Sequence, residues 1–156
     1  MKEIKVFAPA SIANLSCGYD ILGVCLDNIG DEITVRKTKK KGITIKKVSG
    51  QKLSTDISIN VAGVSATALL NESKVDCGFE IEIHKGIKPG SGIGSSAASS
   101  AGSEAASKCL VISIKITENN QNRKLPGTIV TCILLRIIAA QKTAGILPNS
   151  ANIVAS

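Results

Sequence analysis

Aromatic side chains and histidine are almost missing from this chain. Its 156 residues include two Phe, one Tyr, one His and no Trp. Proteins that bind single-stranded nucleic acid commonly stack the bases on aromatic side chains, so we expect no nucleic-acid partner. A catalytic pair of cysteine and histidine would have to use His84, which falls on the polar side of a predicted strand. Because aromatic residues are so few, aliphatic side chains must form the core.

The chain also lacks a long apolar run and a targeting segment. A helix that crosses a bilayer needs ~20 apolar residues in succession. The apolar stretch from Ile129 to Ala140 has only 12 residues and includes an arginine. The first residues, Met1 to Phe7, turn polar too early for a secretory signal peptide. We therefore expect a cytoplasmic protein with no membrane partner.

Positive charge is not spread evenly along the chain. The net charge is +7, of which residues 1–106 carry +2 and residues 107–156 carry +5. A basic surface can bind nucleic acid or another polyanion. The densest basic cluster consists of Lys37, Lys39, Lys40 and Lys41, next to Gly42, and we interpret it as a solvated hairpin turn. The near-neutral first part and the lack of aromatic side chains argue against an RNA-binding domain.

Hydrophobic patterns divide the chain into strands and helices. Strands are predicted where apolar and polar residues alternate, and a buried helix where small and aliphatic residues recur at helical spacing. The predicted strands are Ile4 to Pro9, Asp31 to Thr38, Ile43 to Val48 and Phe79 to His84, the predicted loop is Ser11 to Gly18, and the predicted helix is Ile59 to Leu70. The pattern slips by one residue before Val48, and Lys39 to Gly42 is predicted to form a hairpin connection. This mixture predicts an α/β fold.

The most informative segment is a glycine-rich loop that leads from the last of these strands into an Ala- and Ser-rich helix. It consists of Pro89, Gly90, Ser91, Gly92, Ile93, Gly94, Ser95, Ser96, Ala97, Ala98 and Ser99. Three glycines at alternate positions let backbone N–H groups turn toward one point, and the helix adds its unpaired N-terminal donors and its dipole. Such an arrangement binds a phosphate chain. The hydroxyls of Ser95, Ser96 and Ser99 could reach phosphate oxygens or a bound magnesium ion.

Two common phosphate-binding patterns do not fit this loop. The Walker pattern requires a Gly-Lys pair, which the chain lacks, and the dinucleotide pattern requires a third glycine where Ser95 stands. Without a ligand, the alternative is a tight turn whose small residues serve helix packing. The strand before the loop, the helix after it and the double serine favour phosphate binding.

The segment Pro89 to Ser99 resembles the ATP-binding motif of the GHMP kinases, P-x-x-x-G-L-G-S-S-A-A, from which it departs by one residue fewer after Pro89 and by Ile93 in place of leucine. A second segment, Ala8 to Gly23, is similar to the homoserine kinase pattern AP-x-S-x-AN-x-GPGFD-x-LG. In it, the usual Gly, Pro and Phe are replaced by Ser16, Cys17 and Tyr19. The resemblance implies the fold of a GHMP kinase N-terminal domain, an α+β sandwich with a ribosomal-protein-like module.

The same resemblance assigns roles to individual residues. It implies that the loop binds ATP, that Ser96 helps to coordinate Mg²⁺, and that Asn14 and Asp20 bind homoserine. A carboxylate suits the ammonium group of an amino acid. The alternative for Asn14 and Asp20 is turn formation, which both residue types favour.

The last third of the chain follows a different pattern. The resemblance covers residues 1–106 and implies that an alanine-rich helix, a magnesium-binding glutamate and a motif like GS-x-HADN come next. Ser107 to Ile116 instead alternates like a strand, and Glu118 is the only acidic residue after Glu104. We therefore predict a GHMP kinase N-terminal domain over 1–106 and a divergent segment of unclear fold, which packs poorly, over 107–156. A truncated or frameshifted gene would explain the change, and a divergent short paralogue is the alternative.

The function implied by the resemblance is ATP-dependent phosphorylation of the hydroxyl of L-homoserine, a step of threonine biosynthesis. ATP and Mg²⁺ are the implied cofactors, L-homoserine is the implied small-molecule partner, and the full-length protein is expected to form a homodimer. No catalytic residue is identifiable. The alternative is an inactive truncated remnant that at most binds nucleotide.

Overall fold

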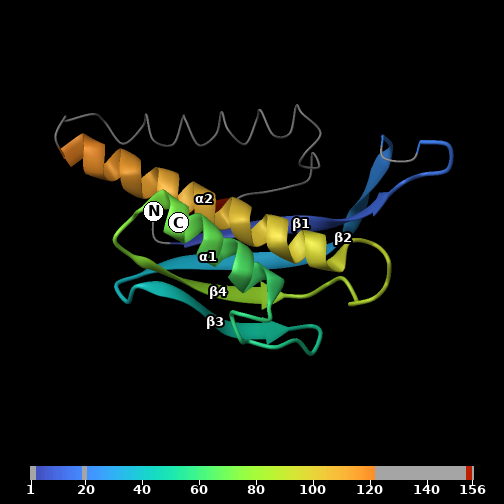
Figure 1. The fold of residues 1–156 in the computed structure, drawn as a ribbon, viewed down its shortest axis with the longest axis horizontal. Helices are drawn as coiled ribbons and strands as arrows, with labels where there is room; N and C mark the ends of the chain where they lie inside the picture. The colour runs from blue at the N-terminus through green and yellow to red at the C-terminus, as the bar shows by residue number, and fades with distance from the viewer. Residues whose placement is uncertain (1–2, 19–20, 122–153, 156) are drawn as a thin grey trace.

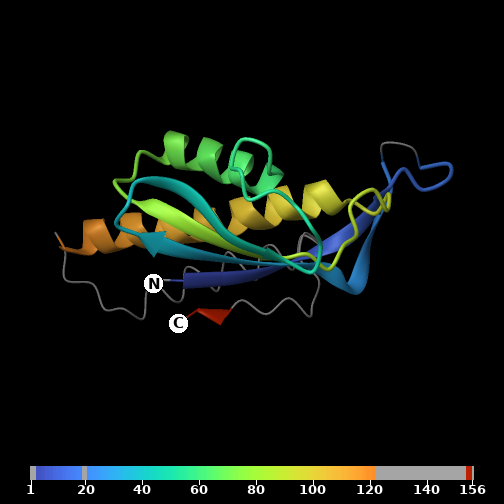
Figure 2. The ribbon, with the colours of Figure 1, turned by 90° about the horizontal axis from the view of Figure 1, so that it is seen from below.

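The computed structural model describes residues 3–18, 21–121 and 154–155. The elements in this part of the chain are β1 (Glu3–Ala13), β2 (Gly23–Thr38), β3 (Gly42–Ser49), α1 (Val61–Ser73), β4 (Gly78–His84), α2 (Ser95–Gln121) and β5 (Val154–Ala155). Both helices lie on one face of the sheet, as Figures 1 and 2 show. The α/β fold expected from the sequence is therefore confirmed.

The sheet has the strand order β3-β4-β2-β1-β5. β2 is antiparallel to both of its neighbours, β1 and β4, whereas β3 and β4 are parallel. Two adjacent parallel strands need a crossover connection, and α1 supplies it. The short β5 pairs only with Ile4 and Lys5 of β1.

The core lies between the sheet and the two helices. Ile33 and Val35 of β2 are fully buried, as their alternation predicted, and Ile81 and Ile83 of β4 continue the same layer. The helices cover them with small and aliphatic side chains, among them Ala62, Ala66, Ala106 and Leu110. The predicted slip in the third strand is also confirmed, because the β3–β4 register shifts between Ile45 and Lys47.

The predicted hairpin between the second and third strands was wrong. β4 lies between β2 and β3, so these consecutive strands do not pair. Gly78, at the start of β4, makes the insertion possible. A Cβ at Gly78 would lie 1.9 Å from the carbonyl oxygen of Lys40 and 2.5 Å from that of Gly42. Because Gly78 has no side chain, the β2–β3 turn can pass directly over the start of β4.

The first strand does not end at Pro9. β1 continues to Ala13, so the first three residues of the predicted loop, Ser11 to Ala13, belong to the strand. Pro9 stands opposite Gly30 of β2, and the register shifts between Pro9 and Ser11. Proline cannot donate a ladder hydrogen bond and is tolerated at such irregularities. The extended β1–β2 pair reaches beyond the rest of the sheet (Figure 2).

The predicted strand over 107–116 was also wrong, because α2 runs without a break from Ser95 to Gln121. Four buried residues in this stretch, Cys109, Leu110, Val111 and Ile114, belong to the core, so the described part of the segment packs well. Runs of β-branched residues can form helices where tertiary packing outweighs propensity. No helix in the described residues is long and apolar enough to span a membrane. The stretch from Ile129 to Ala140 lies outside the described residues.

The sheet face opposite the helices carries ion pairs, of which Arg36 forms the centre. Arg36 of β2 lies 2.5 Å from Glu82 of β4, and its hydrogen bond holds the pKa of that carboxyl below its usual value. We expect Arg36→Met to raise the Glu82 pKa, which a carboxyl NMR titration would measure. A carboxyl group whose pKa is lowered in the folded protein stabilises the fold at any pH above its unfolded pKa of about 4.3. This stabilisation is lost as the pH falls through the pKa of the folded state.

Because both side chains are about one-third exposed, this contribution should stay below about 1 kcal/mol. The variant should therefore lose less stability than the wild type on acidification. An unchanged Glu82 titration in Arg36→Met would contradict the assignment.

Candidate functional site

The glycine loop has the backbone conformation that its sequence predicts. Gly90, Gly92 and Gly94 have φ values of 75°, 77° and 75°, which residues with a Cβ rarely adopt. α2 begins at the next residue, and its first turn is closed by the hydrogen bond from the Ala98 amide to the Gly94 carbonyl, at 2.8 Å. An α-helix leaves its first amides without intrahelical acceptors. These amides and the helix dipole suit an anion at the loop.

One side of the loop rests on β1 and the other is open. The Ser11 amide donates to the Ile93 carbonyl at 3.1 Å, and a Cβ at Gly94 would lie 2.7 Å from the Ser11 hydroxyl. By contrast, a Cβ at Gly90 or Gly92 would meet nothing within 4 Å. The loop therefore presents bare backbone to open space, as a phosphate-binding loop must.

A cavity of about 170 Å³ lies beside the open loop. Its lining combines apolar side chains that precede or begin α1 with polar groups from the start of α2. The lining residues are Leu53, Ser54, Ile59, Asn60, Val61, Lys85, Pro89, Ser95, Ser96 and Ser99. Ile59 is 70% exposed, although the sequence predicts it inside a buried helix. Asn60 instead caps α1, because its side chain accepts from the Ala62 amide.

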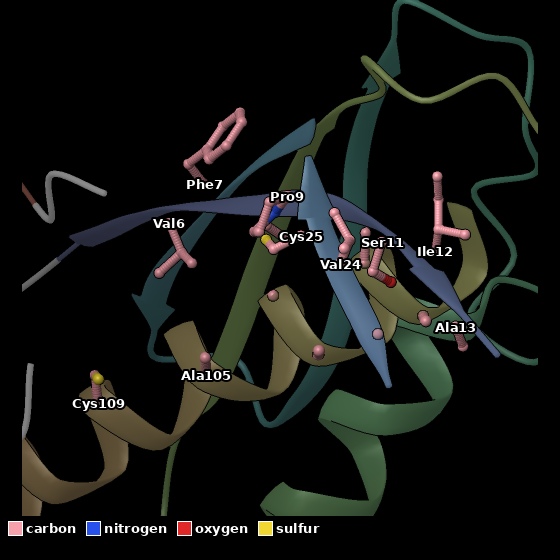
Figure 3. A pocket seen from close by; sticks show the side chains of 16 residues that line it. Val6, Phe7, Pro9, Ser11, Ile12, Ala13, Val24, Cys25, Ala105 and Cys109 are labelled. Carbon is pink, nitrogen blue, oxygen red and sulfur yellow. The ribbon is translucent and has the colours of Figure 1, made fainter. Parts of the chain in front are cut away.

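A larger cavity of about 430 Å³ lies between α2 and the strands β1 and β2, along the helix from Ala97 to Cys109 (Figure 3). Val6, Pro9 and Val24 from the strands face Ala105 and Cys109 of α2 there, and none of the lining residues is charged. This cavity therefore suits an apolar group better than an amino acid with two charges. Partial desolvation and the nearby Asp27 carboxylate raise the pKa of the exposed Cys25 thiol, and burial raises the pKa of the Cys109 thiol. Both thiols are therefore poor nucleophiles at neutral pH.

Beneath the loop lies a buried ion pair that the sequence analysis missed. Lys85 follows the last residue of β4, Asp31 lies in β2, and their side chains are 1% and 0% exposed. The Lys85 ammonium lies 2.5 Å from Asp31 Oδ2 and donates to the Ser95 carbonyl at 3.0 Å and the Ser99 hydroxyl at 2.9 Å. The other carboxylate oxygen, Asp31 Oδ1, accepts from the Ile87 amide at 3.1 Å.

A signal for this pair was present in the sequence. Asp31 occupies the same alternating positions as the buried Ile33 and Val35, and Lys85 those of Ile81 and Ile83. When two strands each place a charge of opposite sign at a position that faces the core, the charges are expected to form a buried pair, since an unpaired charge inside a core is very costly. The β2–β4 register, in which Glu32 faces His84, places the pair at adjacent positions.

The three serines of the loop differ in their surroundings. Ser99 is buried and its hydroxyl donates to Asp31 at 2.9 Å, so this hydroxyl is engaged with the buried ion pair, although Ser99 also lines the cavity beside the loop. The Ser95 hydroxyl donates to the Ile87 carbonyl at 3.4 Å. Ser96 is exposed. Of the three hydroxyls, that of Ser96 is therefore the best placed to contact a ligand.

One of the two predicted homoserine-binding residues, Asn14, lies at the end of β1. Asn14 directly follows this strand, is exposed and has a φ of 59°. Ser11, three residues earlier, contacts the glycine loop, so β1 brings Asn14 to the same end of the molecule. Asp20 lies outside the described residues.

Within the described part of the chain, no three His, Cys, Asp or Glu side chains gather to hold a metal ion. Mg²⁺ does not require such a group, because it usually keeps several waters and binds one or two protein ligands together with substrate phosphates. The exposed Ser96 hydroxyl beside a phosphate loop fits this mode. The residues present are therefore compatible with Mg²⁺ carried by a nucleotide.

Comparison with known proteins agrees with this geometry. Residues 60–120 match the family model described as "GHMP kinases N terminal domain". A homoserine kinase of Methanococcus maripaludis is 49% identical over 99 residues, which cover 62% of this chain and 32% of the relative. The N-terminal region is homologous to homoserine kinases. A homoserine kinase of Xanthomonas campestris pv. campestris is 35% identical over 132 residues, covering 83% of this chain and 41% of the relative.

Solved structures give the same result. The crystal structure of a homoserine kinase from Cytophaga hutchinsonii matches with a TM-score of 0.64 and 42% identity, covering 68% of this chain and 34% of that one. A mevalonate diphosphate decarboxylase from Legionella pneumophila, at 16% identity and a TM-score of 0.55, shares the fold alone. The described residues thus have the fold of a GHMP kinase N-terminal domain.

The extent of these matches bears on the predicted division of the chain. The family match continues past Ala106 to residue 120, and α2 crosses the predicted boundary. The division into 1–106 and 107–156 stays a prediction, since most of its second part lies outside the described residues. The matched regions span about a third of the length of the homoserine kinases from Methanococcus and Cytophaga.

Proposed function

We propose that this chain provides the nucleotide-binding part of a homoserine kinase, which transfers a phosphoryl group from ATP to the hydroxyl of L-homoserine. The observation that carries the proposal is the loop with left-handed glycines at alternate positions, which opens α2 and is bare on one side. Phosphoryl transfer depends mainly on positioning and on stabilising charge. A loop that directs amides at a phosphate chain supplies both.

The cavity beside the loop is the proposed site of the nucleotide base. It has apolar walls formed by Leu53, Ile59 and Val61, whose exposed side chains could cover a flat ring. Asn60 and Ser54 add polar atoms at its edge. The triphosphate would then extend along Gly90 to Ser96, where the helix dipole and the loop amides favour negative charge.

The remaining roles follow the homoserine kinase pattern. Asn14 and Asp20 would hold the amino acid, and Ser96 would contact Mg²⁺. When bound, the metal neutralises charge that develops on the transferred phosphoryl group. In this proposal the protein acts in the cytoplasm in threonine biosynthesis, and the full-length protein forms a homodimer.

Titration calorimetry with ATP, and with guanosine and cytidine triphosphates as controls, tests the proposal. We expect ATP to bind to the 156-residue chain in the presence of Mg²⁺. Tripolyphosphate should bind more weakly, because it fills the loop but leaves the apolar cavity open. Equal affinities for ATP and tripolyphosphate would contradict the proposed base site. If neither ligand binds, the proposed nucleotide site is wrong.

We further expect the 156-residue chain alone to turn over L-homoserine at a rate far below the ~1 per second or more of ordinary enzymes. The matched regions span about a third of the Methanococcus and Cytophaga relatives, and losing even one charge-stabilising group commonly slows an enzyme ~100-fold or more. A coupled assay of ADP release with L-homoserine measures the rate. Ordinary turnover would show that the described region and its C-terminal extension suffice for catalysis. Binding without turnover would favour the alternative of an inactive nucleotide-binding remnant.

A further inference from the structure

We propose that the buried network of Asp31, Lys85 and Ser99 positions the glycine loop for its ligand. The network ties both ends of the loop to the sheet. Asp31 Oδ1 holds the Ile87 amide at the start of the loop, and the Lys85 ammonium holds the Ser95 carbonyl at its end. The inference deepens the proposed function, since a fixed loop keeps its amides directed at a phosphate.

The hydrogen-bond inventory of the network argues against direct ligand binding by Lys85. An ammonium group has three donors and no acceptor. All three donors are in use, toward Asp31, Ser95 and Ser99. The Ser99 hydroxyl in turn donates to Asp31. Lys85 could bind a phosphate only by breaking this network, so its effect on a ligand must pass through the loop.

Between its ends the loop is held by few contacts, chiefly the hydrogen bond from the Ser11 amide to the Ile93 carbonyl and that from the Ser91 amide to the Lys88 carbonyl. Gly90 and Gly92 have no side chains, and a Cβ at either would meet nothing within 4 Å. The hydrogen bonds that hold the ends of the loop therefore act together with the Ser11–Ile93 bond to set where its amides point. A well-packed apolar pair in place of Asp31 and Lys85 would be no less stable in many proteins. It could not, however, bond the Ile87 amide and the Ser95 carbonyl.

Two serines of α2 provide a matched test. Ser99 and Ser103 are both buried and lie one turn apart, but the Ser103 hydroxyl donates to the Ala62 carbonyl of α1, at 2.8 Å. Ser99→Ala and Ser103→Ala each delete one buried hydroxyl, so similar losses of global stability are expected. Only Ser99→Ala removes a member of the network.

Hydrogen exchange and ATP titration distinguish the two variants. In Ser99→Ala we expect amide exchange at Ile87 and Ala98 to accelerate about tenfold and the ATP affinity to fall about tenfold, as for one lost hydrogen bond. In Ser103→Ala both should stay within twofold of the wild type, while exchange in α1 accelerates. A double variant, Asp31→Leu with Lys85→Met, replaces the pair by apolar side chains that cannot bond the Ile87 amide or the Ser95 carbonyl, and it should reproduce the loop effect while keeping the fold.

Equal changes of loop exchange in Ser99→Ala and Ser103→Ala would overturn the proposal, because the network would then serve only general stability. Unchanged loop exchange in the double variant would overturn it as well. If the wild type does not bind ATP, the proposed function fails. The exchange rates at Ile87 and Ala98 still decide whether the network positions the loop.

Discussion

Lys85→Met should lower the free energy of unfolding by about 3 to 5 kcal/mol, the range found when one member of a buried ion pair is removed. The variant leaves the carboxylate of Asp31 fully buried without its counter-charge. It also frees the Ser95 carbonyl from its ammonium donor. Urea denaturation followed by circular dichroism measures the loss.

Two further variants control this measurement. Replacing Asp31 by Asn in the same chain removes the lone charge and should restore most of the lost stability. Lys41→Met breaks an exposed ion pair with Asp76, whose side chains are 77% and 79% exposed, and should leave the midpoint almost unchanged because solvent screens such pairs. If Lys85→Met proves no more destabilising than Lys41→Met, the pair is not buried as described.

Gly92→Ala should lower the affinity for ATP by ~100-fold, equivalent to about 2.7 kcal/mol of binding free energy. The added methyl group meets no protein atom within 4 Å, so it projects into the space where the phosphate chain would lie. The left-handed φ of 77° adds a strain of about 1 kcal/mol to the folded state. Titration calorimetry gives the affinity, and thermal denaturation gives the stability.

Gly42→Ala is a matched control for this strain. Gly42 lies at the β2–β3 turn with a φ of 94°, and a Cβ there would also meet nothing within 4 Å. Both variants should therefore lose similar stability, but Gly42→Ala should bind ATP like the wild type. If the two variants bind ATP equally well, the glycine loop is not the nucleotide site.

Local patterns in the sequence predicted the parts of the site that depend on local backbone geometry. The alternate glycines at 90, 92 and 94 permit a left-handed backbone, which all three adopt, and the strand before them and the helix after them are both present. The buried faces of β2 and β4 were equally evident, because period-two alternation assigns a face before any partner is known.

Features that depend on distant partners were missed. Asp31 and Lys85 are separated by 53 other residues and become a pair only because β4 lies beside β2. The strand predicted over 107–116 failed for a related reason, since burial of Leu110 and Ile114 against the sheet outweighs the β-propensity of isoleucine and valine. Neither the buried ion pair nor the helical conformation of residues 107–116 can be predicted from neighbouring residues in the sequence alone.

The strand order also has a consequence for how the chain reaches its fold. β2 and β3 are joined by three residues and could zip together within microseconds as a hairpin, yet the native sheet keeps them apart. A directly paired β2–β3 intermediate would be a kinetic trap, which must open before β4 can enter. During synthesis β2 and β3 emerge before β4, so the trap can form on the ribosome before Gly78 is made.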